Sequence, residues 1–254
     1  MNGTIQQHCA SIKAMSKTAL IGASATTLLM FAAAAHADSL VTNGSFETNT
    51  GAGQLGYNTT ATGWSVSGGY AFLLAPGTGD TTGADGQYGN LSLWGPNNGS
   101  NNGLPAASPD GGYYLGADAD FQQAPIQQTI NGLTVGDMYQ VGFWWAGAQQ
   151  YTFNGLTYEQ WQVSLGSETN STVTVADASN GFTGWQYQTF DYTATSTSEV
   201  LSFFAQGSPQ GPPPFALLDG VSLSQTPEPG SLPLLFTGLI GGVCILRARK
   251  WMKR

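Results

Sequence analysis

Two stretches near the middle of the chain alternate strictly between apolar and polar residues. In residues 159–166, Trp161, Val163 and Leu165 alternate with glutamine and serine. In residues 138–147 the apolar side chains fall at odd positions: Tyr139, Val141, Phe143 and Trp145. A period of two places one set of side chains on each face of a β-strand, so both stretches predict strands with one buried and one wet face.

Nine further short segments are predicted as strands, and turn residues such as Asn131-Gly132 separate most of them. They are residues 40–46, 63–67, 70–75, 112–117, 126–130, 172–175, 185–193, 200–206 and 215–223. No long helical periodicity occurs between residues 39 and 225. We therefore expect an all-β domain, an antiparallel two-sheet sandwich of the jelly-roll type. The Gly-, Asn- and Pro-rich residues 76–111 form a long loop, of a kind that is often functional or mobile.

The cationic residues are confined to the two ends of the chain. All 7 Lys and Arg residues lie before residue 18 or after residue 246, whereas the 15 acidic residues run from Asp38 to Glu228. Both histidines, His8 and His36, also belong to the first segment. Residues 38–228 are thus acidic and contain no cationic side chain.

The first 37 residues have the pattern of a secretory signal peptide. Lys13 and Lys17 precede an apolar run from residue 18 to 31, and Ala35-His36-Ala37 gives an A-x-A cleavage pattern. We expect residues 1–37 to be a signal peptide and residues 38–225 to be the exported domain. The two cysteines, Cys9 and Cys244, lie outside this domain, which therefore has no disulfide.

Residues 226–254 resemble a membrane-spanning tail. An apolar stretch, residues 232–246, is followed directly by Arg247, Arg249 and Lys250. The stretch predicts a single transmembrane helix, although it is shorter than the usual span. The positive charges predict that its end lies in the cytoplasm and that the acidic domain lies outside.

Pro227-Glu228-Pro229, placed immediately before this apolar stretch and basic end, resembles the PEP-CTERM sorting signal. The resemblance implies export across the inner membrane of a Gram-negative bacterium, transient membrane anchoring, and processing by an exosortase. Many proteins with this tail accompany exopolysaccharide or biofilm production. It therefore implies a secreted or cell-surface location and an exosortase partner.

The domain itself is similar to the jelly rolls of carbohydrate-binding proteins, through Asn43-Gly44-Ser45-Phe46-Glu47 and through residues 218–223 (Leu-Asp-Gly-Val-Ser-Leu). In that group the first and last strands are neighbours, and a structural calcium often lies near them. The parity of Asp219 places it on the apolar side of its strand, where a buried charge needs a partner. Glu47, implied by the resemblance, and Asn43 are its expected companions as Ca²⁺ ligands. The alternative is a bulge that turns Asp219 toward solvent.

The residue inventory of the exported domain excludes most catalytic chemistry. Without His, Cys, Lys or Arg it has no Ser–His–Asp triad, thiol nucleophile, Schiff-base lysine or histidine-ligated zinc. It also lacks the cations that neutralise phosphates, which argues against nucleic acid as a partner. A carboxylate pair such as Asp118 and Asp120 is the one catalytic arrangement left, that of a glycosidase.

Aromatic rings offer an apolar face to sugar rings, so tryptophans are the first candidates for carbohydrate contacts. Trp144 is predicted to lie on the opposite face from the core residue Trp145, and Trp94 lies in the long loop. Polar contacts are expected from Asp118, Gln149 and Gln150. For each single residue, packing or loop anchoring is the competing role.

These features predict a non-enzymatic, exosortase-sorted protein of the cell surface or matrix that associates with polysaccharide through a carbohydrate-binding-like sandwich. Two alternatives remain at this point. One is a structural matrix protein with an acidic surface, bound calcium and no specific sugar site. The other is a secreted glycosidase.

Overall fold

The computed structural model describes residues 38–226, which form thirteen β-strands and no helix. The predicted signal peptide and the sorting tail, including Pro227, Glu228 and Pro229, lie outside the described residues. Within residues 38–226 no helix is long and apolar enough to cross a membrane.

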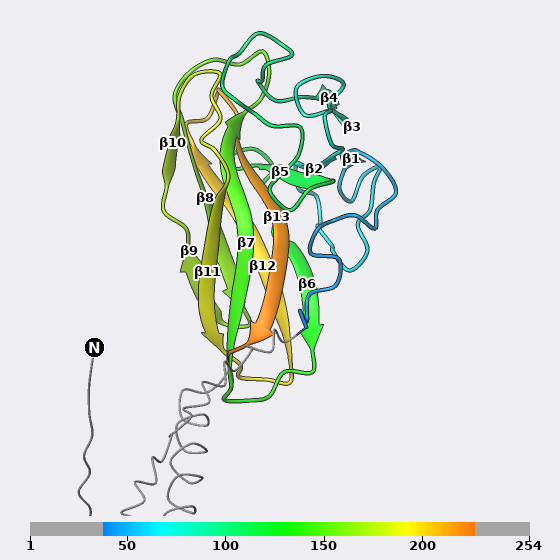
Figure 1. The fold of residues 1–254 in the computed structure, drawn as a ribbon, viewed down its shortest axis with the longest axis vertical. Coiled ribbons are helices and arrows are strands. Elements are labelled where there is room, and N and C mark those ends of the chain that lie inside the picture. The colour runs from blue at the N-terminus through cyan, green and yellow to red at the C-terminus, as the bar shows by residue number, and fades with distance from the viewer. Residues whose placement is uncertain (1–37, 227–254) are drawn as a thin grey trace, which may run out of the picture. The chain divides into compact units, whose positions relative to one another are not determined.

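The strands form an antiparallel two-sheet sandwich, which confirms the predicted fold class (Figure 1). The first sheet has the order β1(Gly53–Gln54), β2(Ala71–Leu74), β5(Tyr114–Asp118), β13(Pro214–Gln225), β7(Met138–Gln149) and β11(Gln186–Thr193). The second has the order β10(Val175–Asp177), β8(Thr157–Leu165), β12(Ser198–Ser208) and β6(Ile126–Asn131), with β9(Glu168–Ser171) paired to β8. A separate hairpin joins β3(Ala84–Gly86) to β4(Gly89–Leu91). From β5 to β8, and again from β11 to β13, successive strands alternate between the two sheets, as in a jelly roll.

The inner core fills the space between the sheets. Trp145 and Phe143 from β7 meet Trp161 and Val163 from β8, all at most 1% exposed. The Trp161 indole also donates a hydrogen bond across the sandwich to the Leu217 carbonyl, at 3.0 Å. The alternation predicted for β8 is confirmed, since its burial follows a period of two throughout.

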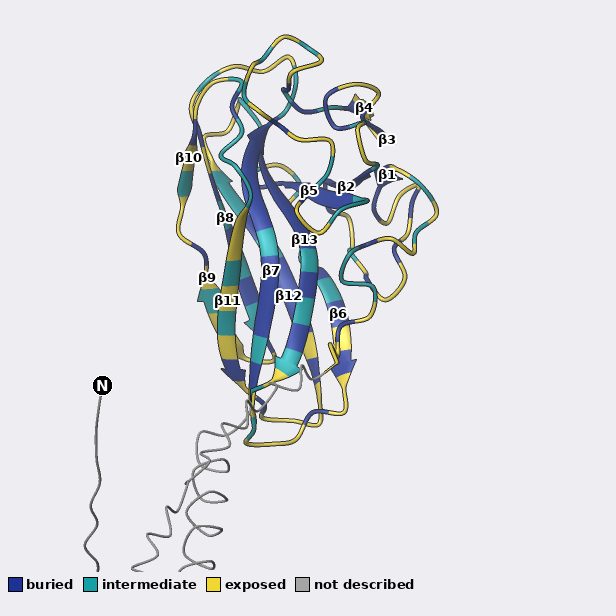
Figure 2. Ribbon diagram, in the orientation of Figure 1, coloured by how far each residue is buried: buried dark blue, intermediate teal, exposed yellow. Residues whose placement is uncertain are grey.

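A second core lies on the outer face of the six-stranded sheet. Leu91, Leu93 and Leu104 of the long loop pack on Phe72 and Phe215, which point away from the inner core. β2, β5 and the first six residues of β13 are consequently buried on both faces (Figure 2). The long loop is therefore a packed layer. For the same reason β7 alternates only in its first half and is buried along its last five residues.

Two predicted strands, residues 40–46 and 63–67, are not formed as strands. Of a third, residues 172–175, only Val175 belongs to a strand, because the Thr172 hydroxyl accepts from Trp161 N at 3.0 Å and interrupts the ladder. Asn43 and Phe46 adopt positive φ angles of 54° and 56°, which break an extended ladder. The first segment nevertheless runs beside β13, because Leu40 N donates to Leu223 O at 2.8 Å and Val221 N donates to Gly44 O at 3.0 Å. The chain thus enters the domain where β13 ends.

Candidate functional site

A cleft of about 330 Å³ opens where β5 ends and β13 begins. The strand register brings its walls together, because Phe215 pairs with Asp118 on one side and with Ala148 on the other. The cleft is lined by residues from five places in the sequence: Tyr70, Tyr88, Asp118, Asp120, Phe121, Gln150, Phe153, Gln210, Gly211, Pro213 and Pro214.

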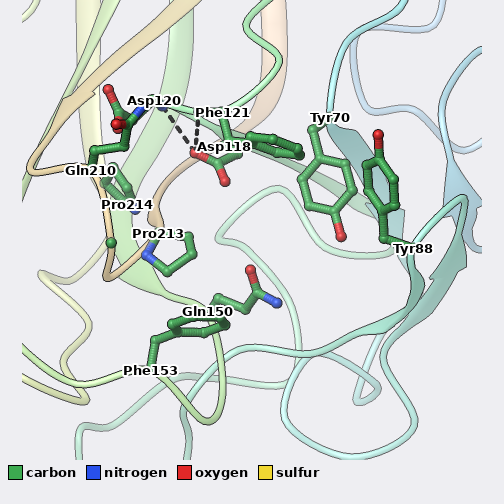
Figure 3. Close-up of a pocket in the computed structure, with 11 residues that line it drawn as sticks. Tyr70, Tyr88, Asp118, Asp120, Phe121, Gln150, Phe153, Gln210, Pro213 and Pro214 are labelled. Carbon is green, nitrogen blue, oxygen red and sulfur yellow. Dashed lines mark hydrogen bonds between the residues drawn. The ribbon is translucent and has the colours of Figure 1, made fainter.

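Three aromatic rings form one wall of this cleft (Figure 3). The ring centroids of Tyr70, Tyr88 and Phe121 lie 5.5 to 5.9 Å from one another. Tyr70 is buried, whereas Tyr88 is 63% and Phe121 is 45% exposed. Large exposed rings held against a buried one present a preorganised apolar surface to a ligand.

The backbone and amide groups around these rings hold them in place. Tyr70 N donates to Gln122 O at 3.0 Å, and the Gln122 amide donates to the Tyr88 hydroxyl at 2.7 Å. Asp118 N donates to Tyr70 O at 3.0 Å. The turn after β5 therefore fixes the positions of Tyr70 and Tyr88.

Asp118 contributes a buried carboxyl group to the cleft. One oxygen, Oδ1, accepts hydrogen bonds from the backbone N–H groups of Asp120 and Phe121, at 2.9 and 3.0 Å. The pKa of Asp118 is raised to about 6, mainly by burial and to a lesser extent by the neighbouring Asp120 carboxylate, while the two N–H groups oppose the shift. Figure 3 shows the other oxygen pointing away from these bonds, toward the gap above Gln150.

The opposite wall is formed by Phe153, by Gln150 and by Pro213 and Pro214 at the start of β13. Trp94 supports this wall from outside the cleft lining, because its indole donates to Phe153 O at 2.6 Å and its ring packs on Tyr151 at 4.7 Å. Sequence reasoning placed Asp118 and Gln150 at a binding site, and the structure brings these two together in the cleft.

The other predicted carbohydrate contacts lie elsewhere. Gln149 is fully buried and joins two loops, donating to Gly155 O at 2.9 Å and accepting from Asn180 N at 2.7 Å. Trp144 lies on the outer face of β7, 5.1 Å from the ring of Tyr187 on β11. Their roles in binding, like that of Trp94, stay predictions.

Sequence reasoning missed Tyr70, Tyr88 and Phe121. Tyr70 opens a predicted strand, and the other two belong to turns with no periodic pattern. Their aromatic character is a signal in itself, but only the fold shows that these three segments meet.

The predicted calcium ligands at the domain rim, Asn43, Glu47 and Asp219, are called the rim set. Asp219 is fully buried, its Oδ2 accepts from the Ser108 hydroxyl, and its Oδ1 has no partner among the described residues, which fits a cation ligand. The bulge after Asp219 does not turn it to solvent. The Asn43 carbonyl, however, already accepts from Phe46 N and from the Trp64 indole, at 3.1 and 2.9 Å.

Glu47, the third member, is exposed and accepts from Tyr113 N at 2.6 Å. Across residues 38–226 no group of three or more His, Cys, Asp or Glu side chains is arranged to hold a metal ion. Calcium at the rim set stays a prediction.

Comparisons with known proteins give fold-level similarities only. No family model matches the chain, and no curated protein matches it. Among solved structures it is similar to TmCBM61, determined in complex with β-1,4-galactotriose, with a TM-score of 0.43 and 16% identity over 75% of this chain and 100% of that one.

Two further similarities are of the same kind. One is to the CBM22-1 xylan-binding domain of Paenibacillus barcinonensis Xyn10C, with a TM-score of 0.37 and 10% identity over 74% of this chain and 95% of that one. The other is to the K1 cleaved adhesin domain of Lys-gingipain from Porphyromonas gingivalis W83, with a TM-score of 0.39 and 14% identity over 72% of this chain and 96% of that one.

Proposed function

We propose that the domain is a non-catalytic module that binds an uncharged polysaccharide in the cleft between Tyr88 and Phe153. The observation that carries the proposal is the pairing of exposed aromatic rings with the Asp118 carboxylate and the Gln150 amide in one cleft. Rings stack on the apolar faces of sugars, while carboxylate and amide groups accept and donate hydrogen bonds to hydroxyls.

The charge of the domain supports a neutral ligand. Residues 38–228 contain no Lys, Arg or His, and Asp118 and Asp120 both line the cleft. An acidic glycan would meet like charge with no cation to offset it. Carbohydrate-binding modules among the structurally similar proteins include one solved with a galactotriose and one named for xylan.

The glycosidase alternative fits this arrangement less well. Asp118 and Asp120 are two residues apart and both come from the end of β5, so they share a wall of the cleft. A glycosidase needs two carboxyl groups that flank the scissile bond. Because Asp118 has a raised pKa, hydrolysis of each polysaccharide that binds should be measured as well. Hydrolysis by the parent chain that is lost in Asp118→Asn would show that the domain is a glycosidase and would refute the non-catalytic proposal.

The binding test uses the full-length chain, affinity electrophoresis against neutral polysaccharides, and calorimetry on the best ligand. We expect Tyr88→Ala and Phe121→Ala each to weaken binding about 5- to 30-fold, because a stacked ring contributes roughly 1 to 2 kcal/mol. Trp144→Ala is the matched control, an aromatic truncation on the outer face of β7. Loss of binding in Trp144→Ala alone would move the site to that face, and no binding to any glycan would favour the structural matrix protein.

The proposal includes export and sorting. The signal-like residues 1–37 and the Pro227-Glu228-Pro229 tail support an exosortase-processed protein of the cell surface or extracellular matrix, associated with exopolysaccharide or biofilm. In a host with an exosortase, mass spectrometry of the mature protein should show loss of the tail. Replacing Pro227-Glu228-Pro229 by three alanines should leave the tail attached, and unchanged processing would refute the assignment.

A further inference from the structure

Three polar side chains from β8 and β10 face one another inside the sandwich. Asp177 pairs directly with Thr157, and Val175 pairs with Glu159, so Asp177 and Glu159 are diagonal neighbours on the same face. Opposite and diagonal positions on one face of an antiparallel pair lie about 5 to 8 Å apart, within reach of converging side chains. Thr157 and Glu159 are fully buried, and Asp177 is 2% exposed.

The polar atoms of this cluster lack partners. Both carboxyl oxygens of Glu159, Oδ2 of Asp177 and the hydroxyl of Thr157 have no hydrogen-bond partner within residues 38–226. The Thr157 hydroxyl is near enough to the Glu159 carboxyl to lower the pKa of Glu159. The two groups nevertheless do not meet the geometry of a hydrogen bond. Buried polar atoms are nearly always paired, so four unpaired oxygens on three neighbouring residues indicate a missing ligand.

The Glu159 carboxyl lies against β7 of the other sheet. A Cβ atom at Gly147 on β7 would lie 2.6 Å from Oε2 of Glu159, so the glycine allows the carboxyl to approach the opposite strand. Asp177 also lines a polar cleft of about 470 Å³ formed by residues 100–102 and 176–183. Asp177, at 2% exposed, is the member of the cluster that lies next to this cleft.

We propose that Glu159, Asp177 and Thr157 bind a calcium ion at this edge of the sandwich. The site is separate from the rim set and draws on different strands. Ca²⁺ takes six to eight oxygen ligands, and two carboxylates and a hydroxyl leave positions for water entering from the polar cleft. The cation neutralises two carboxylates that have no Lys, Arg or His for a partner anywhere between residues 38 and 228.

The competing explanation is an acid pair that stays protonated. The pKa of Glu159 is raised to about 8, mainly by burial and also by the Asp177 carboxylate, and burial raises the pKa of Asp177 to about 7. Without a cation, both groups favour the folded state at low pH. Their contribution to the free energy of unfolding is complete below about pH 4 and is lost as the pH rises through 7 and 8. A bound cation reverses this trend, because it binds the ionised carboxylates.

The test is the melting temperature of the full-length chain at pH 8, with calcium and with EDTA. At a calcium concentration about 100-fold above the dissociation constant we expect a rise of roughly 5 to 10 °C. Glu159→Gln and Asp177→Asn should each remove most of this rise. Asp191→Asn removes an exposed carboxylate of β11 and should retain it, as the matched control.

Asp219→Asn separates the two candidate sites. Any calcium-dependent rise in melting temperature that this variant retains cannot come from the rim set. Equal melting temperatures of the parent chain in calcium and in EDTA would overturn the proposal, whatever the variants do. A full response in Glu159→Gln would overturn it as well. Should that variant fail to fold, calorimetric titration of the parent chain and of Asp177→Asn with calcium decides, and equal heats would count against the site.

Discussion

Asp219 gives the sharpest test of how burial controls the stability of this domain. It lies on β13 just before the bulge, fully buried, with its carboxyl against the Ser108 hydroxyl. Its pKa is raised to about 8, mainly by burial and to a lesser extent by the carboxylates of Asp110 and Glu47. The Ser108 hydroxyl and the neighbouring Gly220 N–H oppose the shift without cancelling it.

The size of the effect follows from the difference in pKa between the folded and unfolded chain. An aspartate has a pKa of about 3.8 when unfolded, so near pH 7 the folded state holds a proton that the unfolded state has lost. The raised pKa favours folding fully below about pH 4, and this contribution is lost as the pH rises toward 8. At about 1.4 kcal/mol per pKa unit, the loss by pH 7 is about 4 kcal/mol.

Asp219→Asn removes the charge and keeps the shape, so its free energy of unfolding should not carry this penalty. In urea denaturation with EDTA present, we expect the variant to match the parent chain near pH 4 and to exceed it by about 4 kcal/mol at pH 7. Asp191→Asn is the control, because this exposed carboxylate of β11 should change stability by less than about 1 kcal/mol. A stability difference between Asp219→Asn and the parent that stays constant from pH 4 to pH 7 would refute the reasoning.

Three further substitutions test the core, the cleft wall and the bulge. Trp161→Phe removes the bond to Leu217 O and leaves a cavity, so urea denaturation should show a loss of about 2 to 4 kcal/mol; a loss below 1 would contradict this role. Trp94→Phe frees the loop at Phe153, so calorimetry should show weaker polysaccharide binding with little change in melting temperature, and an unchanged affinity would remove Trp94 from the site's support. Gly220→Ala places a side chain at a φ of 58° and should cost about 1 to 2 kcal/mol in the same urea assay, so a neutral result would show that the bulge relaxes.

The sequence predicts the long strands well, because their pattern reflects burial directly. Trp161, Val163 and Leu165 enter the inner core as their spacing indicates, and Trp144 and Trp145 lie on opposite faces of β7. The short edge elements are harder to predict. Residues 40–46 have a strand-like composition, but the left-handed conformations of Asn43 and Phe46 turn the chain instead.

The cleft could be predicted only in part, because segments far apart in the sequence meet to form it. Asp118 and Gln150 are polar residues next to buried strand ends, which is a local signal. Tyr88 reaches the cleft because the β3–β4 hairpin belongs to a loop that packs on the outer face of the six-stranded sheet. That packing depends on contacts between distant segments, such as Leu91 with Phe72, and no spacing within the loop reveals it.

The positions of the entry and exit of the chain determine how the domain can present its cleft. Leu40 bonds to Leu223, and Thr226 N donates to Met138 O at 2.9 Å, so both ends of the described chain lie at the same end of β13 (Figure 1). The cleft begins at Pro214, at the other end of this 12-residue strand. At about 3.3 Å per residue the strand is a spacer of roughly 40 Å. The aromatic wall therefore lies at the far end of β13 from residue 226, so under the proposed function a long polysaccharide could bind there without approaching the sorting tail.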